Sequence, residues 1–311
     1  MDRWLIEYIY WLFYNDGSIE SLAKAAVLKF EHMPDYLYKY RTFCDKHLEA
    51  LRQGVLYFTA TNSLNDIKEA NIVISNKADS LIHQKIYNEL REMYGLPKAR
   101  ITSSTELMKA INDHFRRQAG EDIEGWDFAE TEEFARFAKQ LESIRENQLS
   151  LLQKQARNMY SVCCFSAAND INRMWAHYAD NHQGFCIEYD FKSLGDEDLQ
   201  TALLFPVLYL KDSRVFINDI AQVDGNSGML SATIKEKAEW ECEQEWRLVH
   251  HVKEHGTSQK MPKPTGIYLG ERTNEHNTRI MMEYCAKDKI PLFKMKYNQL
   301  TDRIEPVLLH Q

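Results

Sequence analysis

The sequence predicts an α+β protein in which two strand-rich segments form one core and a helical segment is inserted between them. Short apolar runs with strand-like alternation recur in residues 33–66 and 159–311. Residues 67–158 are instead rich in Glu, Lys, Arg and Gln, poor in Gly, and apolar at helical spacing. The 311 residues are 44% hydrophobic, which suits a chain that buries a sizeable core. We therefore expect residues 33–66 and 159–311 to form the core and 67–158 to form a helical insertion.

Residues 1–32 are predicted to form two helices packed on this core, with a break at residues 16–18. The first 15 residues are apolar and aromatic, but Asp2 and Glu7 interrupt them and no small-residue cleavage site follows. The apolar stretch is also too short to span a bilayer. We expect a buried amphipathic helix, with partner docking as the alternative, in a cytoplasmic protein that does not contact a membrane.

The first core segment begins with a strand at residues 36–41, where aromatic residues alternate after Pro34. A helix at 45–53 should end at Gly54, because glycine readily adopts the left-handed conformation that stops a helix. A second strand is expected at 55–59.

In the insertion, residues 127–160 combine one apolar stripe with alternating charges elsewhere, which predicts a long helix. One interpretation is a solvated helix that packs on the core. The other is a platform for an acceptor substrate or a partner protein.

After residue 160 the strand pattern returns. Asp170 can cap a short helix that carries Met174, Trp175 and Tyr178 on its apolar side, and Pro206 indicates a sheet edge or a bulge. Strands are predicted at 162–166, 184–190, 204–210, 214–217, 266–270 and 292–297, and helices at 170–178, 229–238 and 273–285.

Composition and spacing argue against several classes of protein. A net charge of −8 disfavours a surface that coats nucleic acid broadly, although it leaves room for a local basic groove. Six cysteines without zinc-type spacing indicate a reduced, intracellular protein. His177 and His182 are five residues apart, which is wrong for two metal ligands on one helical face. No Gly-rich phosphate loop or nucleophile elbow is present.

The stretch from Trp240 to Val249 places four acids and an arginine at the entrance of a predicted strand. Alternation along an extended backbone would point Glu243 and Glu245 to the same side. Two carboxylates on one face, walled by aromatic residues, can support acid–base or cation-stabilising chemistry. The alternative is a surface ladder in which Glu245 pairs with Arg247.

A second group of candidate residues comes from the other strands. On the first strand, Tyr38 and Tyr40 share one face and Lys39 and Arg41 the other, so Arg41 could hold a phosphate or ribose. The alternative there is an exposed basic edge. Ser166 ends a predicted strand, where its hydroxyl could bond a ligand.

The ordered motifs Tyr38–Arg41, Cys164–Ser166, Met174–Tyr178, Gly184–Tyr189 and Trp240–Arg247 resemble the bacterial family catalogued as domain of unknown function 2971. The resemblance covers most of the chain outside residues 1–32 and 67–158, and it implies no function.

The same residues have a weaker resemblance to the ADP-ribosyltransferase superfamily. It implies a split β-sheet core in which Glu245 is the catalytic glutamate and Glu243 the first glutamate, which influences acceptor choice. Arg41 or Tyr40 and Ser166 would bind NAD, with Trp175 and Tyr178 also in the cofactor-binding set. One departure is that Phe165-Ser166-Ala167 stands where the superfamily has Ser-Thr-Ser.

The resemblance predicts an enzyme that cleaves NAD at the nicotinamide–ribose bond. It would transfer ADP-ribose to a protein or nucleic-acid acceptor, or hydrolyse NAD, with no metal. Such an enzyme could be a toxin or phage-defence effector with an antitoxin or other partner protein. One alternative is a non-catalytic nucleotide sensor or interaction module, favoured if Lys237 or Arg247 buries Glu243 and Glu245 away from any cleft. Another is a nuclease with Asp66, Glu188 and Glu243 around a metal.

Overall fold

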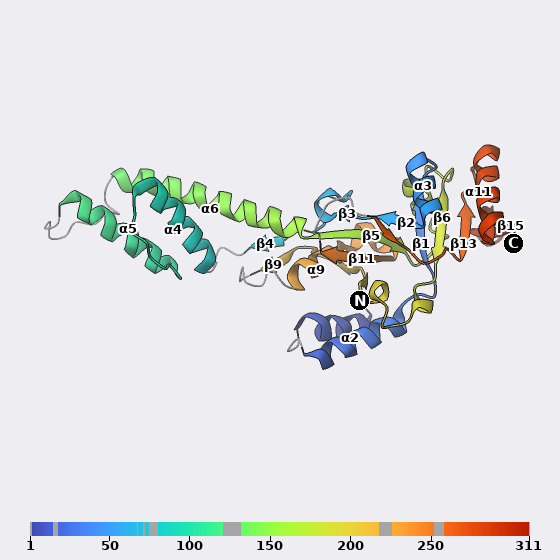
Figure 1. Ribbon diagram of the computed structural model, residues 1–311, viewed down its shortest axis with the longest axis horizontal. Coiled ribbons are helices and arrows are strands. Elements are labelled where there is room, and N and C mark those ends of the chain that lie inside the picture. The colour runs from blue at the N-terminus through green and yellow to red at the C-terminus, as the bar shows by residue number, and fades with distance from the viewer. Residues whose placement is uncertain are drawn as a thin grey trace. The chain divides into compact units, whose positions relative to one another are not determined.

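A computed structural model describes residues 2–14, 18–66, 68–70, 72–74, 80–120, 132–217, 226–251 and 258–310 (Figure 1). The chain divides into two compact units. The core unit comprises Met1–Ala70, Met159–Ser213 and Met229–Gln311, and the insert unit comprises Asn71–Asn158 and Arg214–Gly228. Helices surround a mixed sheet, so the predicted α+β class is confirmed.

The core unit is built on a nine-stranded mixed sheet in which the β13–β14 pair is parallel and the other neighbours are antiparallel. The edge strand β7 contains Pro206, as the sequence predicted. Across the sheet the strands are β15 (Arg303–His310), β14 (Leu292–Asn298), β13 (Gly266–Leu269), β6 (Phe185–Tyr189), β1 (Leu37–Arg41), β5 (Tyr160–Ser166), β11 (Glu245–His251) and β7 (Leu204–Pro206), with β3 (Thr59–Ala60) also beside β5.

The sheet is nearly divided between β1 and β5. β1 pairs with β6 along its whole length, but it pairs with β5 at a single position, Tyr38 opposite Ser166. Figure 1 shows β5 and β11 running across the direction of β1, β6 and β13. The two halves of the sheet therefore separate beyond this one pair.

Helices cover both faces of the sheet, and alternate residues of β1 face opposite sides. Leu37 packs in the cluster that includes α3 (Asp45–Gln53) and α11 (Glu275–Asp288). Tyr40 packs on the other face with α7 (Asn172–Tyr178), whose Trp175 is fully buried. Gly54 stops α3 in the predicted left-handed conformation, with φ of 63°.

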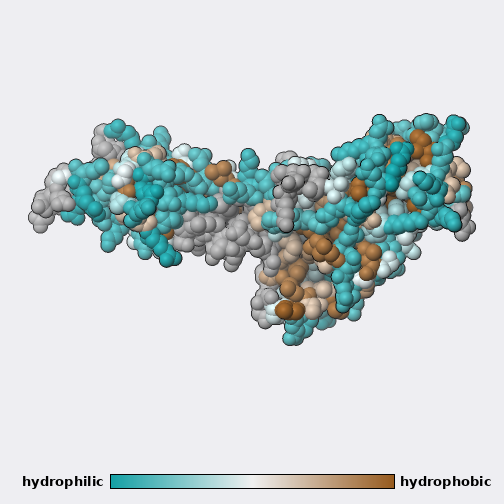
Figure 2. Space-filling view, in the orientation of Figure 1, coloured by the Kyte–Doolittle hydropathy of each residue, from teal (hydrophilic) through white to brown (hydrophobic). Residues whose placement is uncertain are grey.

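The N-terminal helices pack on the core unit. Tyr8 of α1 (Arg3–Ile9) lies in an apolar cluster with residues of β5, β7 and β11. Lys29 of α2 (Ile19–His32) is buried and donates to the carbonyls of Thr201 and Ala202, both at 2.8 Å. Figure 2 shows apolar patches on the surface of the molecule, and large apolar side chains that are exposed on these two helices include Ile6, Ile19, Leu22 and Val27. Within the described residues, no helix has the length and apolar character needed to cross a bilayer.

Four sequence predictions need correction. The run predicted as one strand at 204–210 is divided into β7 and β8 (Leu208–Leu210), which belong to different sheets. The segment predicted as one helix at 229–238 forms the end of α9 (Asn226–Ala232), the strand β10 (Ile234–Glu236) and the short helix α10 (Lys237–Trp240). β10 is a strand because it pairs in parallel with β8, a tertiary contact that overrides helical preference. Asp170 does not cap α7, since Ile171 occupies the N-cap position. The run predicted at 55–59 is divided into β2 (Val55–Tyr57), which pairs with β12 (Ser258–Lys260), and β3.

The insert unit is mainly helical. α4 (Ser80–Tyr94) packs against α5 (Ser104–Ala119) and α6 (Glu132–Asn158), with Tyr87, Leu90 and Ile111 fully buried. The strand predicted at 214–217 forms as β9 (Val215–Ile217) and pairs in parallel with β4 (Ile72–Ile74) of the same unit. The predicted start of the long helix at 127, and residues 16 and 17 of the predicted break between the N-terminal helices, lie outside the described residues.

Gly184 provides a test of the close packing between α7 and β1. A Cβ atom at this position would lie 2.2 Å from the Arg41 carbonyl oxygen, a backbone atom that cannot swing away. We expect Gly184→Ala to lower the free energy of unfolding by roughly 1–3 kcal/mol. At Gly266 the nearest atom, 3.1 Å away, is the end of the Glu188 side chain, so Gly266→Ala should cost less. Equal urea midpoints for the two variants would contradict this packing.

Candidate functional site

The two glutamates of the acidic motif meet through a turn and not along one strand. Glu241–Glu243 forms a 3-10 turn, Gln244 is left-handed with φ of 47°, and β11 begins at Glu245. The predicted extended Glu-x-Glu is therefore wrong in its backbone. The carboxylates still converge, because the Lys235 ammonium donates to Glu243 Oε2 at 2.9 Å and to Glu245 Oε2 at 3.0 Å.

Five buried charged residues form the ion cluster, which consists of Glu69, Lys235, Glu243, Glu245 and Arg247. Their side chains are between 1% and 4% exposed. Lys235 also lies 3.1 Å from Glu69 Oε1, and Arg247 donates to Glu245 Oε1 at 2.8 Å and to Glu69 at 3.2 Å. The predicted Glu245–Arg247 pair thus forms, but it is buried and not a surface ladder. Three carboxylates against two cations leave one net negative charge.

The surroundings of Glu245 keep it ionised. Burial alone would raise its pKa, but Arg247 and Lys235 outweigh burial and lower the pKa from 4.5 to about 2. The neighbouring carboxylates in turn raise the pKa of Arg247, despite its burial. Because Arg247 also donates to the Ala232 carbonyl at 2.7 Å, the guanidinium is held at three points.

A cavity of about 240 Å³ opens where β1 and β5 separate, and the ion cluster forms part of its wall. We call it the β1–β5 cavity. Four consecutive residues of β1, from Tyr38 to Arg41, line it, so the cavity runs along the edge of β1 that faces β5. Beyond Tyr38 this edge has no paired strand among the described residues. The wall lined by Lys39 and Arg41 is basic, and the wall lined by Glu243 and Glu245 is acidic.

A chain of hydrogen bonds fixes the acidic wall. The Tyr178 hydroxyl donates to Glu243 Oε1 at 3.0 Å and accepts from Asn65 Nδ2 at 3.0 Å. Burial and the Glu243 charge raise the pKa of Tyr178, so its hydroxyl stays protonated. All three residues line the cavity. This arrangement presents a hydroxyl, an amide and a carboxylate together to whatever enters.

Five of the predicted site residues meet in this cavity, and two do not. Those that line it are Tyr40, Arg41, Tyr178, Glu243 and Glu245. Ser166 is buried, where its hydroxyl donates to the Glu243 carbonyl at 2.7 Å and so braces the acidic turn. Trp175 is fully buried, and its indole donates to the Asn169 carbonyl at 2.6 Å. Neither residue lines the cavity.

Sequence reasoning missed Glu69 and Lys235 as members of the site. Lys237, the lysine considered instead, forms an exposed pair with Glu241 at 3.3 Å. The acids considered for a nuclease are not brought together: Glu188 accepts from Tyr268 at 2.6 Å, and Asp66 from the Lys68 amide at 2.9 Å. Neither of those two acids lines the cavity with Glu243. Within the described residues, no group of three or more His, Cys, Asp or Glu could hold a metal ion.

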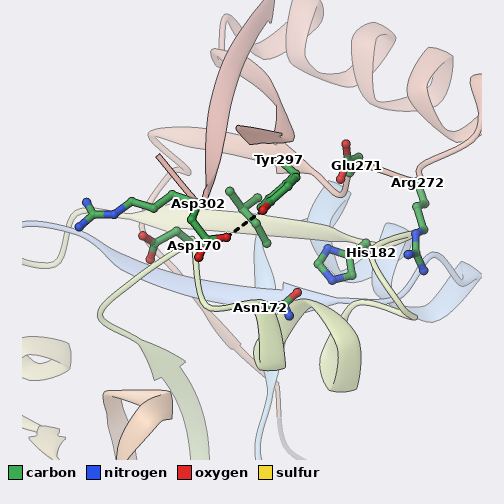
Figure 3. A pocket seen from close by; sticks show the side chains of 9 residues that line it. Asp170, Asn172, His182, Glu271, Arg272, Tyr297 and Asp302 are labelled. Carbon is green, nitrogen blue, oxygen red and sulfur yellow. Dashed lines mark hydrogen bonds between the residues drawn. The ribbon is translucent and has the colours of Figure 1, made fainter. Parts of the chain in front are cut away.

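A larger cavity of about 450 Å³ lies elsewhere in the core unit, between the loop around His182 and the β14–β15 hairpin (Figure 3). Its polar lining mixes both charges without a buried ion cluster, and Tyr297 donates to Asp302 at 2.8 Å within the β14–β15 hairpin. Two residues that the sequence analysis considered, Asp170 and His182, line this larger cavity. The candidate glutamates Glu243 and Glu245 do not line it. The β1–β5 cavity is therefore the better candidate site.

Comparison with known families identifies one match. Residues 174–248 match the family model described as Protein of unknown function (DUF2971), which confirms that predicted resemblance. The matched segment contains Tyr178, Lys235, Glu243 and Arg247, and thus most of the acidic wall. No curated protein and no solved structure matches the chain.

Lys235 and Lys237 allow a matched test of the ion cluster. Lys235→Met removes the ammonium shared by three buried carboxylates, and we expect it to cost about 3–5 kcal/mol of stability. Lys237→Met breaks an exposed pair and should cost less than about 1 kcal/mol. Urea unfolding of both variants measures the difference. Similar losses would show that the cluster is not buried as described.

The depressed pKa of Glu245 predicts a pH dependence of stability. Its folded-state pKa, about 2, lies below the ordinary 4.5, so its stabilisation is present above pH 4.5 and lost as pH falls toward 2. The stability gap between the native protein and Glu245→Gln should therefore shrink by about 3 kcal/mol over that range. Unfolding curves at pH 5, 4 and 3 check this. A gap that stays constant would contradict the assigned environment.

Proposed function

We propose that this protein is an ADP-ribosyltransferase-like enzyme that binds NAD in the β1–β5 cavity and cleaves its nicotinamide–ribose bond. One observation carries the proposal: the cavity where β1 parts from β5 has both Glu243 with Tyr178 and Lys39 with Arg41 in its lining. NAD has a positively charged nicotinamide ring at one end and a negatively charged pyrophosphate further along. The acidic wall suits the first and the basic wall suits the second.

The divided sheet supports the finer part of the fold prediction. An ADP-ribosyltransferase-like core is a split sheet, and here a single pair of residues, Tyr38 and Ser166, joins the two halves. Cavities are common where strands diverge at such a point, because the backbone edge is open to a ligand. The volume, about 240 Å³, is below the ~300–1,000 Å³ usual for small-molecule pockets. We therefore place the nicotinamide riboside end of NAD inside it, with the pyrophosphate at Arg41 and the adenosine half outside.

In the proposed reaction the C–N bond between ribose and nicotinamide breaks, and nicotinamide leaves as a neutral molecule with the bonding electron pair. The positive charge moves to the ribose as an oxocarbenium-like centre. An acceptor group or water then bonds to the ribose carbon and releases its proton. A carboxylate held ionised in a water-poor site stabilises the positive charge that develops.

The two glutamates take different parts in this scheme. Glu245 is enclosed by donors from Arg247 and Lys235, so we assign it to holding the acidic wall in place. Glu243 accepts one bond at each oxygen, from Tyr178 and Lys235, and keeps capacity to accept from a ribose hydroxyl. We therefore assign Glu243 to substrate contact. This differs from the superfamily resemblance, which implied that Glu245 is the catalytic glutamate.

A specific observation favours a second candidate, a nucleotide-binding sensor without catalysis. Arg247 and Lys235 neutralise much of the charge of Glu245, and such buried pairs also occur in purely structural networks. The cavity would then bind a nucleotide and leave it intact. Binding of NAD by calorimetry without any nicotinamide release would identify this candidate.

Glu243 and Glu241 provide the test, because both belong to the same 3-10 turn. Glu243→Gln should lower nicotinamide release from NAD by about 10²-fold or more, since the developing positive charge loses its nearest carboxylate. Glu241 is exposed and does not line the cavity, so Glu241→Gln should retain native rates. The assay is chromatographic detection of nicotinamide. Native turnover in a folded Glu243→Gln variant would overturn the assignment.

A further inference from the structure

A second, smaller cavity adjoins the β1–β5 cavity and shares residues with it. It has a volume of about 140 Å³ and is lined by residues of β1, α3 and β2, together with Thr59 and Ile187. Arg41 and Thr59 line both cavities. Arg41 is therefore within reach of both spaces, and we call the second one the α3 cavity.

The lining of the α3 cavity is basic. It includes Arg41, Lys46 and His47 but no acidic side chain. The Lys46 ammonium lies over the Tyr57 ring, 4.8 Å from its centroid. Arg41, Lys46 and His47 form no ion pair with any other residue that the structure describes. This contrasts with Arg247 and Lys235, whose charges are fully matched by carboxylates.

The positive charges around the α3 cavity also affect the pKa of His47. Its Nδ1 lies 3.0 Å from the Thr42 carbonyl, which fixes the ring. Burial lowers the pKa of His47, and Arg41 and Lys46 lower it further, against the effect of the Thr42 carbonyl. An anion in the cavity would relieve this repulsion.

Charge matching indicates which anion the α3 cavity takes. In the proposed NAD complex the pyrophosphate lies at Arg41, which lines both cavities. The Lys46 ammonium is then left over, and it suits a further phosphate monoester, which carries about −1.5 to −2 charge near pH 7. The small volume suits a phosphate group and not a second nucleoside.

We propose that the α3 cavity is a phosphate subsite, so that the preferred substrate is a dinucleotide carrying an extra phosphate on its adenosine half, as NADP does. The inference rests on the proposed function for the placement of the dinucleotide. What it adds is that the protein binds NADP in preference to NAD, and that Lys46 gives this preference.

Calorimetric titration of the full chain with NADP and with NAD tests the subsite. The native protein should bind NADP at least about tenfold more tightly than NAD, the effect of one charge-assisted contact. Lys46→Gln should reduce this ratio to within about threefold while leaving the affinity for NAD unchanged. Lys287→Gln is the matched control, because Lys287 is an exposed helical lysine that lines a different cavity, and it should keep the native ratio.

The outcomes separate this inference from the proposed function. Equal affinities for NADP and NAD, a ratio unchanged in Lys46→Gln, or binding of neither dinucleotide would overturn the subsite. Cleavage of NAD with equal affinities would retain the proposed function and reject the subsite. Preferred binding of NADP that depends on Lys46, without release of nicotinamide from either dinucleotide, would retain the subsite and reject the catalytic proposal.

Discussion

The buried ion cluster holds together three parts of the chain that would otherwise repel or separate. Glu69 comes from the segment after β3, Lys235 from β10, and Glu243, Glu245 and Arg247 from the acidic motif. Burial makes each charge costly on its own, so each depends on the others for compensation. The acidic wall of the β1–β5 cavity exists because this compensation is nearly complete and leaves a single net negative charge.

The second constraint is the near-division of the sheet between β1 and β5. Ser166 contributes to both features, since it stands opposite Tyr38 at the one pair that joins the halves and also donates to the carbonyl of Glu243. The same residue thus sets where the sheet opens and where the acidic turn lies. These two contacts place the start of the acidic turn next to the point where β1 and β5 part.

Local patterns in the sequence predicted much of the fold, because they reflect local physical chemistry. Gly54 stops α3 as expected, Pro206 lies on an edge strand, and the alternation of residues 36–41 gives β1. The acidic motif also supplies two residues, Glu243 and Glu245, that line the β1–β5 cavity. What failed depends on contacts distant in the sequence: β10 is a strand only through its pairing with β8, and that pairing buries Lys235. Nothing in the local sequence around Glu69 indicates that it meets Arg247, which is 178 residues away.

The most direct test of the account is a crystal structure of the protein with an NAD analogue whose nicotinamide–ribose bond cannot be cleaved. The account predicts the ribose beside Glu243 and Tyr178, the pyrophosphate beside Arg41, and Glu245 still paired with Arg247. A ligand found in the cavity around His182, or one whose nicotinamide end lies against Lys39 with the phosphates toward Glu243, would contradict it.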